Sequence, residues 1–176
     1  MHTFQLQLVI GGLMLLATVQ LAINRSLLNA YIDTYDTDAT IEATSIGHAM
    51  ADEAMGKHFD RYTASGKVYT TGGLTSAAGL GPDGMSESVK GTDNEPYRSA
   101  GSFNDFDDYN RYQRIVTSDH LGDFLVTDSV CYVQDANLDA QSASATWYKL
   151  ITVTVTHKNL LRPVVVQSLR VYRRYH

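Results

Sequence analysis

The chain has 176 residues, enough for one ordinary domain and an additional long element. Charged residues make up 19% and the net charge is only -5, which argues against a nucleic-acid-binding protein that relies on overall positive charge. The single cysteine, Cys131, cannot form an internal disulfide, and we expect it to be a small buried apolar residue.

The first predicted element is a long apolar helix. Phe4–Ile23, FQLQLVIGGLMLLATVQLAI, carries no charge and does not have the basic start of a signal peptide. At about 1.5 Å per residue it would measure roughly 30 Å, the thickness of a bilayer core. We expect the range 1–28 to be an assembly or membrane helix, covered by lipid or by other copies. The residues expected in that covered surface are Phe4, Leu6, Leu8, Val9, Ile10, Leu13, Met14, Leu15, Leu16, Val19, Leu21 and Ile23.

Over 29–62 the helical pattern becomes amphipathic. No proline interrupts Met1–Tyr62, so the sequence predicts one helix through this range. Within it, Glu53 and Lys57 are spaced for an ion pair along the helix. Apolar residues at spacings of three and four form one stripe: Ile32, Tyr35, Ala39, Ala43, Ile46, Met50 and Ala54.

The Gly-, Ser- and Thr-rich range 63–106 is predicted to be a surface loop region with a short strand at Lys67–Thr70. The range 107–176 is predicted to form an antiparallel sheet, because the period changes to two. GDFLVTDSVCYVQ, TWYKLITVTVTH and VVVQSLRVYRRY are predicted strands, and RYQRIVT is a fourth candidate. The last strand is expected to place Val165, Leu169 and Val171 on one face.

A sheet with one apolar face and a helix with one apolar stripe can cover each other. The predicted fold is therefore α+β. A long N-terminal helix, with an apolar protruding half, packs its second half on a small antiparallel sheet, giving a lollipop shape.

The motif FNDFDDYN, Phe103–Asn110, concentrates oxygen ligands on a predicted turn, and two interpretations remain open. Closely spaced carboxylates suit Ca²⁺, although the spacing of an EF-hand is absent. Alternatively, the Asp and Asn side chains cap backbone N–H groups while Phe106 and Tyr109 anchor the turn to the core. The candidate calcium ligands are Asn104, Asp105, Asp107, Asp108 and Asn110.

Catalytic patterns are missing from the sequence. There is no nucleophile elbow and no phosphate-binding loop, and His48 with Asp52 has no third metal ligand nearby. We therefore expect no enzyme activity and no cofactor beyond a possible structural calcium ion. The acidic helix and the basic carboxyl end are expected to steer and register neighbouring subunits, or alternatively to offer a basic surface to nucleic acid or an anionic host surface. The basic residues considered are Arg25, Lys149, Lys158, Arg162, Arg170, Arg173 and Arg174.

Two stretches carry a family resemblance. ATSIGHAMADEAMGKHFD, Ala43–Asp60, and FNDFDDYN resemble segments of the type IV pilin superfamily, most closely minor pilins of the mannose-sensitive haemagglutinin pilus type. The closing KLITVTVTH…SLRVYRR is similar to the last hairpin of many minor pilins and pseudopilins. In pilins the mature chain begins after a short basic leader and usually has Glu at its fifth position. Here Gln5 occupies that position, so either Met1 is the mature start or processing differs.

The resemblance implies a structural subunit that polymerises through its N-terminal helix into an extracellular filament. The partners it implies are other copies of the chain, the inner membrane before assembly, and the pilus assembly machinery. An alternative is a membrane-anchored minor pilin or pseudopilin that primes assembly, or carries adhesion at a filament tip through Thr63–Ala100. A third hypothesis is a membrane-tethered binding or catalytic domain unrelated to pili.

Overall fold

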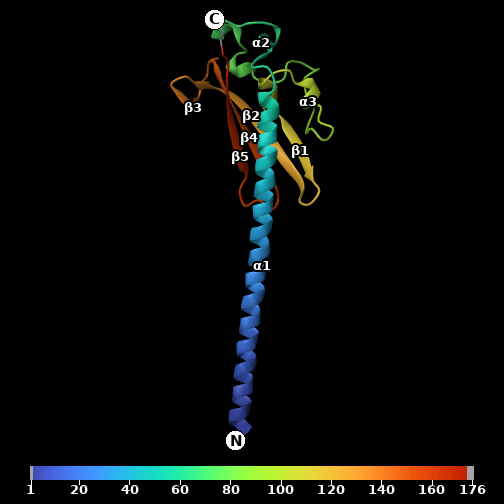
Figure 1. The fold of residues 1–176 in the computed structure, drawn as a ribbon, viewed down its shortest axis with the longest axis vertical. Helices are drawn as coiled ribbons and strands as arrows, with labels where there is room; N and C mark the ends of the chain where they lie inside the picture. The colour runs from blue at the N-terminus through green and yellow to red at the C-terminus, as the bar shows by residue number, and fades with distance from the viewer. Residues whose placement is uncertain (1, 174–176) are drawn as a thin grey trace. The chain divides into compact units, whose positions relative to one another are not determined.

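The computed structural model describes residues 2–173 and divides into two compact units, the first ending at Asp38 and the second beginning at Ala39 (Figure 1). It confirms the α+β class, with one long helix and an antiparallel sheet. The helices are α1 (His2–Met55), α2 (Arg61–Ser65) and α3 (Ser99–Ser102), with 3-10 turns η1 (Thr71–Gly73), η2 (Ala77–Gly79) and η3 (Asp107–Tyr109). The strands are β1 (Gln113–Ser118), β2 (Gly122–Gln134), β3 (Asn137–Gln141), β4 (Tyr148–Thr156) and β5 (Val164–Val171).

The first unit consists of the N-terminal part of α1. Every described side chain from 3 to 35 is exposed. Two threonines of this part satisfy their hydroxyl groups within the helix: Thr18 Oγ1 donates to the Leu15 carbonyl at 2.8 Å, and Thr34 Oγ1 to the Ala30 carbonyl at 2.8 Å. These hydroxyls therefore need no water, which makes the segment compatible with an apolar environment.

Helix α1 ends at Met55 rather than at Tyr62, so the prediction of one helix through Tyr62 was wrong at its end. Gly56 follows, and its N–H donates to the Asp52 carbonyl at 3.0 Å and the Glu53 carbonyl at 3.2 Å. The chain then restarts as α2, where Asp60 is the N-cap in a capping box with Thr63.

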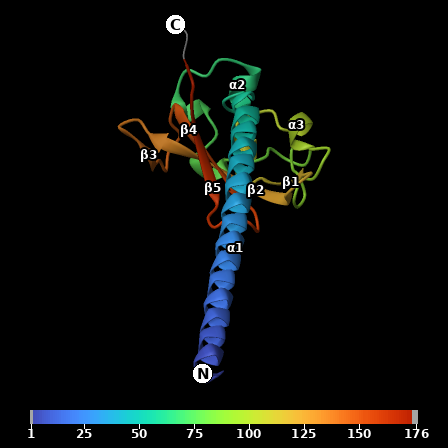
Figure 2. The same cartoon turned by 60° about the horizontal axis from the view of Figure 1, so that its bottom comes forward.

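The second unit contains the sheet, whose strand order is β1-β2-β4-β5, with β3 paired to the end of β2. The three predicted strands and the fourth candidate, which becomes β1, are confirmed. β3 was not predicted. The strand predicted at Lys67–Thr70 is wrong, because the Val68 N–H donates to the Tyr172 hydroxyl at 3.2 Å instead of to a neighbouring strand. Figure 2 shows α3 on the β1 side of the sheet.

Val165, Leu169 and Val171 share one face of β5, as predicted, but it is the more exposed face of the strand. Val165 is 55% exposed and Val171 43%, whereas Val166 is 8% exposed and lies opposite Val153 of β4. Arg170 follows on the inward face and donates to the carbonyls of Met55 and Lys57. A polar residue is needed there because the last carbonyls of a helix have no partner within the helix.

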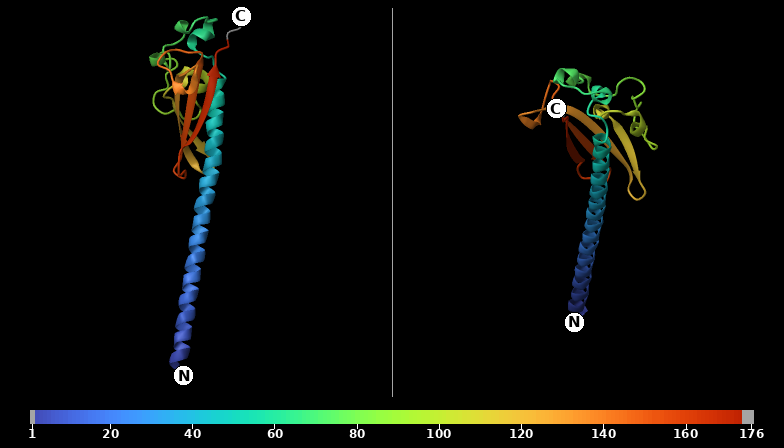
Figure 3. Two further views of the ribbon diagram at one scale, coloured as in Figure 1. Left: turned by 90° about the vertical axis from the view of Figure 1, so that its left-hand side faces the viewer. Right: turned by 45° about the horizontal axis from the view of Figure 1, so that its top comes forward.

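From Ala39 onward, α1 lies along one face of the sheet (Figure 3, left). The predicted stripe is confirmed in this part, since Ala39, Ala43, Met50 and Ala54 are at most 2% exposed. A Cβ added to Gly47 would lie 2.8 Å from Val166 Cγ2, so glycine permits the close approach of helix and strand. The main core cluster consists of Ala43, Met50, Ala51 and Ala54 of α1 with Phe103, Phe106, Tyr109, Tyr112, Phe124, Val126, Val130, Ile151, Val153, Val155 and Val166.

Candidate functional site

The apolar surface of the first unit is the first candidate site. The twelve residues predicted to be covered are between 45% and 69% exposed in the single chain: Phe4, Leu6, Leu8, Val9, Ile10, Leu13, Met14, Leu15, Leu16, Val19, Leu21 and Ile23. By length and composition α1 can cross a membrane, and its most apolar stretch has no buried residue. Such a surface requires lipid or protein around it.

The energetics favour covering this surface. Fully burying one large apolar side chain contributes about 1.5–3 kcal/mol. Even at the lower figure, the predicted set together exceeds the ~4–15 kcal/mol that association costs in lost translational and rotational freedom. The segment therefore has enough apolar surface either to hold the chain in a bilayer or to drive association of copies.

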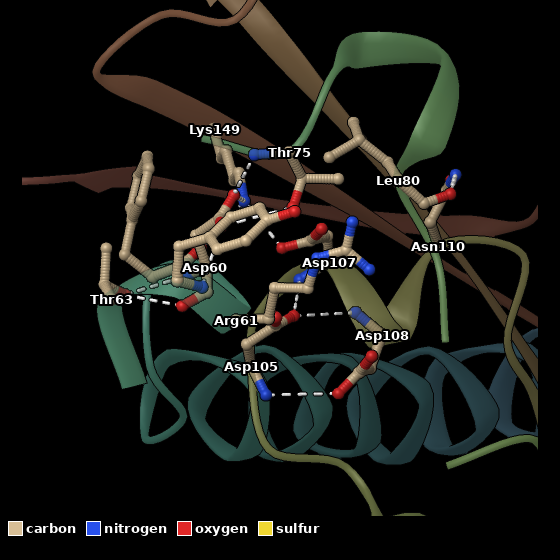
Figure 4. A network of polar contacts seen from close by, with 12 residues as sticks. Asp60, Arg61, Thr63, Thr75, Leu80, Asp105, Asp107, Asp108, Asn110 and Lys149 are labelled. Carbon is tan, nitrogen blue, oxygen red and sulfur yellow. Dashed lines mark hydrogen bonds and ion pairs between the residues drawn. The ribbon is translucent and has the colours of Figure 1, made fainter. Parts of the chain in front are cut away.

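The second unit contains a buried lysine cluster, made of Lys149, Asp60 and Asp107, which Figure 4 labels, together with Phe59 and Tyr132. Lys149 is fully buried, and its Nζ donates to Asp107 Oδ1 at 2.6 Å, the Phe59 carbonyl at 2.8 Å and Asp60 Oδ2 at 2.9 Å. Nζ also lies 4.7 Å from the ring centre of Phe59 and 5.1 Å from that of Tyr132. The three donors of the ammonium group thus have three acceptors.

The two carboxylates of the lysine cluster have different environments. Asp60 also accepts hydrogen bonds from the Thr75 N–H at 3.0 Å, the Tyr62 N–H at 3.2 Å and the Tyr132 hydroxyl at 3.3 Å. Burial alone would raise the pKa of Asp60, but Lys149 and these donors hold it below its usual value. Burial raises the pKa of Asp107, although Lys149 opposes this. The protein therefore favours ionised Asp60 more strongly than ionised Asp107.

Within the acidic motif, two carboxylates cap the turn reciprocally. Asp105 Oδ1 accepts hydrogen bonds from the backbone N–H groups of Asp107 at 3.0 Å and Asp108 at 3.3 Å. Asp108 Oδ2 accepts hydrogen bonds from those of Asn104 at 2.9 Å and Asp105 at 3.1 Å. Burial and the neighbouring Asp107 raise the pKa of Asp105 to about 9, and burial raises that of Asp108 to about 6. Asn110 is used elsewhere, because Nδ2 donates to the Leu80 carbonyl and Oδ1 accepts the Val130 N–H.

These contacts support the capping interpretation of FNDFDDYN. Phe106 and Tyr109 are fully buried and anchor the turn. The ammonium group of Lys149 lies where a cation would neutralise Asp107. Among residues 2–173, no group of three His, Cys, Asp or Glu side chains is arranged to hold a metal ion. Calcium binding stays a prediction, and we do not assign these residues as metal ligands.

A second buried cation, Arg114, connects β1 to helix α1. Arg114 Nη2 donates to Glu53 Oε1 at 2.9 Å and to Ser99 Oγ at 2.8 Å, and its guanidinium carbon lies 4.0 Å from the Tyr97 ring centre. Glu53 therefore pairs with Arg114, whereas Lys57 Nζ, its predicted partner, donates to the Ala100 carbonyl at 2.8 Å. The sequence did not indicate this contact, because its members lie far apart along the chain.

Asp128 is buried beside the Arg114 cluster with both carboxylate oxygens lacking a hydrogen-bond partner. Burial raises the pKa of Asp128 to about 8, and the positive charge of Arg114 opposes this only partly. Cys131, on β2, was predicted to be buried but is only half-buried. Its thiol is free, and burial raises the pKa of the thiol.

A cavity of about 370 Å³ opens between the loop region and the acidic motif. Leu80, Gly81 and Pro82 line one part, and Asn110, Arg111 and Gln113 contribute polar groups. Arg111 adopts a φ of 66°, a left-handed conformation that is unusual for a residue with a side chain. Such strain is often found at ligand-binding sites, so the cavity is a candidate binding site of the loop region.

The basic residues predicted to guide assembly do not form one group. Arg25, Arg162 and Arg173 are exposed. Lys149 is fully buried and Arg170 is used at the end of α1, so these two are held within the fold. Arg174 lies outside the described residues.

Comparison with known proteins gives no relative: no family model, no curated protein and no solved structure matches the chain. The fold itself is consistent with a pilin-like fold, in which a long N-terminal helix, apolar in its first part, packs its later part on an antiparallel sheet.

Proposed function

We propose that the chain is a structural subunit of a type IV pilus-like filament and polymerises through its N-terminal helix. The observation that carries this proposal is the continuous exposed apolar surface of α1, which extends from Phe4 to Ile23 without a charge. Because no residue of this apolar stretch is buried, the surface is available for assembly.

In the proposed mechanism the N-terminal helix has one role before assembly and another during assembly. Before assembly it holds the chain in the inner membrane, where lipid covers its apolar side chains. During assembly, the pilus machinery transfers it into a bundle made of the same helix from other copies. Contacts between successive copies that do not close on themselves give an open helical polymer at the cell surface.

The resemblance to minor pilins of the mannose-sensitive haemagglutinin type supports this proposal through the two motifs quoted above. The exposed Arg25, Arg162 and Arg173 would guide neighbouring subunits. The neutral Gln5 would be easier to transfer into an apolar core than a carboxylate, although it cannot pair with a neighbouring amino terminus. The proposal includes no catalytic activity and requires no cofactor.

A second candidate is a membrane-anchored minor pilin or pseudopilin that primes assembly or carries adhesion at a filament tip. The cavity beside Arg111, lined by Leu80 and Pro82 of the loop region, favours this candidate because it offers a ligand-sized site away from α1. Copy number separates the two candidates: a major subunit occurs along the whole filament, whereas a tip subunit occurs about once per filament.

Electron microscopy after detergent removal tests the proposal. The full chain should form helical fibres. Leu16→Lys should prevent fibre formation, because it places a charge in the apolar surface. Thr40→Lys, at an exposed polar position of α1, should still allow fibres to form. Detergent-bound monomers that persist for the unmodified chain would exclude the major-subunit proposal and leave the priming role. Fibres that form equally well with Leu16→Lys would exclude assembly through this helix.

A further inference from the structure

The lysine cluster has the composition of a reactive site as well as that of an ion pair. Lys149 Nζ lies 2.6 Å from Asp107 Oδ1 and 2.9 Å from Asp60 Oδ2. Lys149 and Asp60 are fully buried, and Asp107 is 2% exposed. The rings of Phe59 and Tyr132 lie against the ammonium group. An amine and a carboxyl group are thus held in contact where bulk water is excluded.

We propose that Lys149 and Asp107 condense to an intramolecular amide, which makes this cluster a self-modification site that joins η3 to β4. The inference stands independently of the filament proposal, because it concerns only the chemistry inside the second unit.

The reaction balances without a further reactant. The ammonium group of Lys149 and the carboxylate of Asp107 together give an amide, –NH–CO–, and one water molecule. The Nζ–Cγ bond forms, one Cγ–O bond of Asp107 breaks, and that oxygen leaves as water; overall, the ammonium group loses two protons and the departing oxygen gains two. No atom is oxidised or reduced, and the charges of the pair cancel in the neutral product.

The surroundings favour this condensation over a permanent ion pair. Reacting groups held together in a fixed geometry gain an effective concentration on the order of 10⁵–10⁸ M over the same groups free in water. The geometry also gives Nζ two carboxylates at hydrogen-bond distance, so an acceptor for its proton stands beside the carboxyl carbon that it would attack. The released water returns to solvent, which opposes the reverse reaction.

The two neighbouring carboxyl groups can divide the proton transfers. Asp60, which five hydrogen-bond donors hold in its ionised form, is placed to accept a proton from Nζ. Asp105 begins the same turn as Asp107, and burial together with Asp107 raises its pKa to about 9, so it carries a proton at neutral pH. Asp105 can therefore donate a proton to the departing oxygen of Asp107. Groups with pKa values displaced in opposite directions are typical of acid–base pairs.

The product would connect two distant segments of a chain that cannot make an internal disulfide, because Cys131 is its single cysteine. The amide would close the chain between Asp107 and Lys149 and so restrict the unfolded state, as a disulfide does. One N–H would remain on the former amine to donate to Asp60 Oδ2 or to the Phe59 carbonyl.

Intact-mass spectrometry of the denatured full chain tests the proposal directly. The mass should be lower than that of the sequence by one water molecule, and proteolysis should give one linked product that contains Asp107 and Lys149. The full sequence mass would overturn the proposal. A mass lower by one water without this linked product would also overturn it, since Asp83–Gly84 can lose water as a succinimide within the backbone.

Matched variants separate the amide from other losses of water. Lys149→Arg should restore the full mass, whereas Lys158→Arg, at an exposed lysine, should leave the mass lower by one water. In chain that is collected unfolded, before the amide can form, and then folded, Asp105→Asn should slow the mass change at least about tenfold, because general acid catalysis typically contributes 10²–10⁴-fold. The Trp147 fluorescence of that variant should return at the same rate as in the unmodified chain. An unchanged rate of water loss would exclude Asp105 as the proton donor.

Discussion

Replacing Glu53 by alanine tests the polar contact between α1 and β1. Glu53 Oε1 accepts hydrogen bonds from Arg114 Nη2 at 2.9 Å and from the Tyr109 hydroxyl at 2.9 Å. Arg114 is 6% exposed, so its guanidinium would lose its carboxylate partner inside the protein. Breaking a buried ion pair from one side costs about 3–5 kcal/mol.

The structure places the expected effect at the lower end of that range. The Glu53 side chain keeps 24% exposure, so water can replace part of the lost contact, and the hydroxyls of Ser99 and Tyr112 still accept from Arg114. We therefore expect Glu53→Ala to lower the free energy of unfolding by about 3 kcal/mol. Glu53→Gln keeps one acceptor oxygen and should lower it by about half as much, since hydrogen bonds to charged groups contribute about 1.5–3 kcal/mol.

Guanidinium denaturation of the detergent-solubilised full chain measures this effect. The single tryptophan, Trp147, packs against Tyr172 in a second cluster of buried residues and reports unfolding of the sheet unit. Asp52→Ala, at an exposed position of the same helix, is the matched control and should change stability by no more than about 0.5 kcal/mol. A loss below about 1 kcal/mol for Glu53→Ala, the range of a surface ion pair, would refute the reasoning.

Three further predictions concern single positions of the second unit. Burial raises the pKa of Asp128 to about 8, so between pH 4 and pH 8 the folded state holds a proton that the unfolded chain, with a pKa of about 3.9, has released. The free energy of unfolding should therefore fall as the pH rises over this range. Urea titrations should show a weaker fall for Asp128→Asn, and the same pH dependence in both chains would contradict the reasoning. Gly47→Ala should destabilise the protein by about 1–3 kcal/mol, because the added methyl group would press against Val166. Val166→Ala in the same chain should recover part of that loss. Strictly additive effects of the two substitutions in thermal unfolding would argue against this contact. Because Asp105 and Asp108 already accept backbone N–H groups, removal of calcium with a chelator should leave the thermal midpoint unchanged, and a clear drop would support a calcium site.

The buried face of the helix was predictable because the apolar residues repeat with the helical period. The spacing of Ala39, Ala43, Met50 and Ala54 matches the helical period, and these side chains meet the core as expected. The absence of proline was a weaker guide, because the helix ends at Met55 although no proline stands there. The apolar residues of β5 share one face as expected, but the spacing did not show that this face is the exposed one, or that Arg170 on the other face donates to the carbonyls of Met55 and Lys57.

The lysine cluster was only partly visible in the sequence. Lys149 lies on the same face of β4 as Ile151 and Val153, a signal in the strand alternation that was missed, because the lysine was grouped with the basic residues expected at the surface. Its partners were not predictable, since Asp60 follows the helix and Asp107 belongs to a turn far along the chain. The acidic motif was predictable as a capped and anchored turn, but not as the partner of a buried cation.

The most direct test of the filament proposal is a helical reconstruction, by electron cryomicroscopy, of the fibres formed by the full chain. The account predicts density for the helix from Phe4 to Ile23 at the centre of the fibre, in contact with the same segment of neighbouring copies. Fibres whose centre is formed by other segments, with this helix exposed at the periphery or bound by detergent, would contradict it.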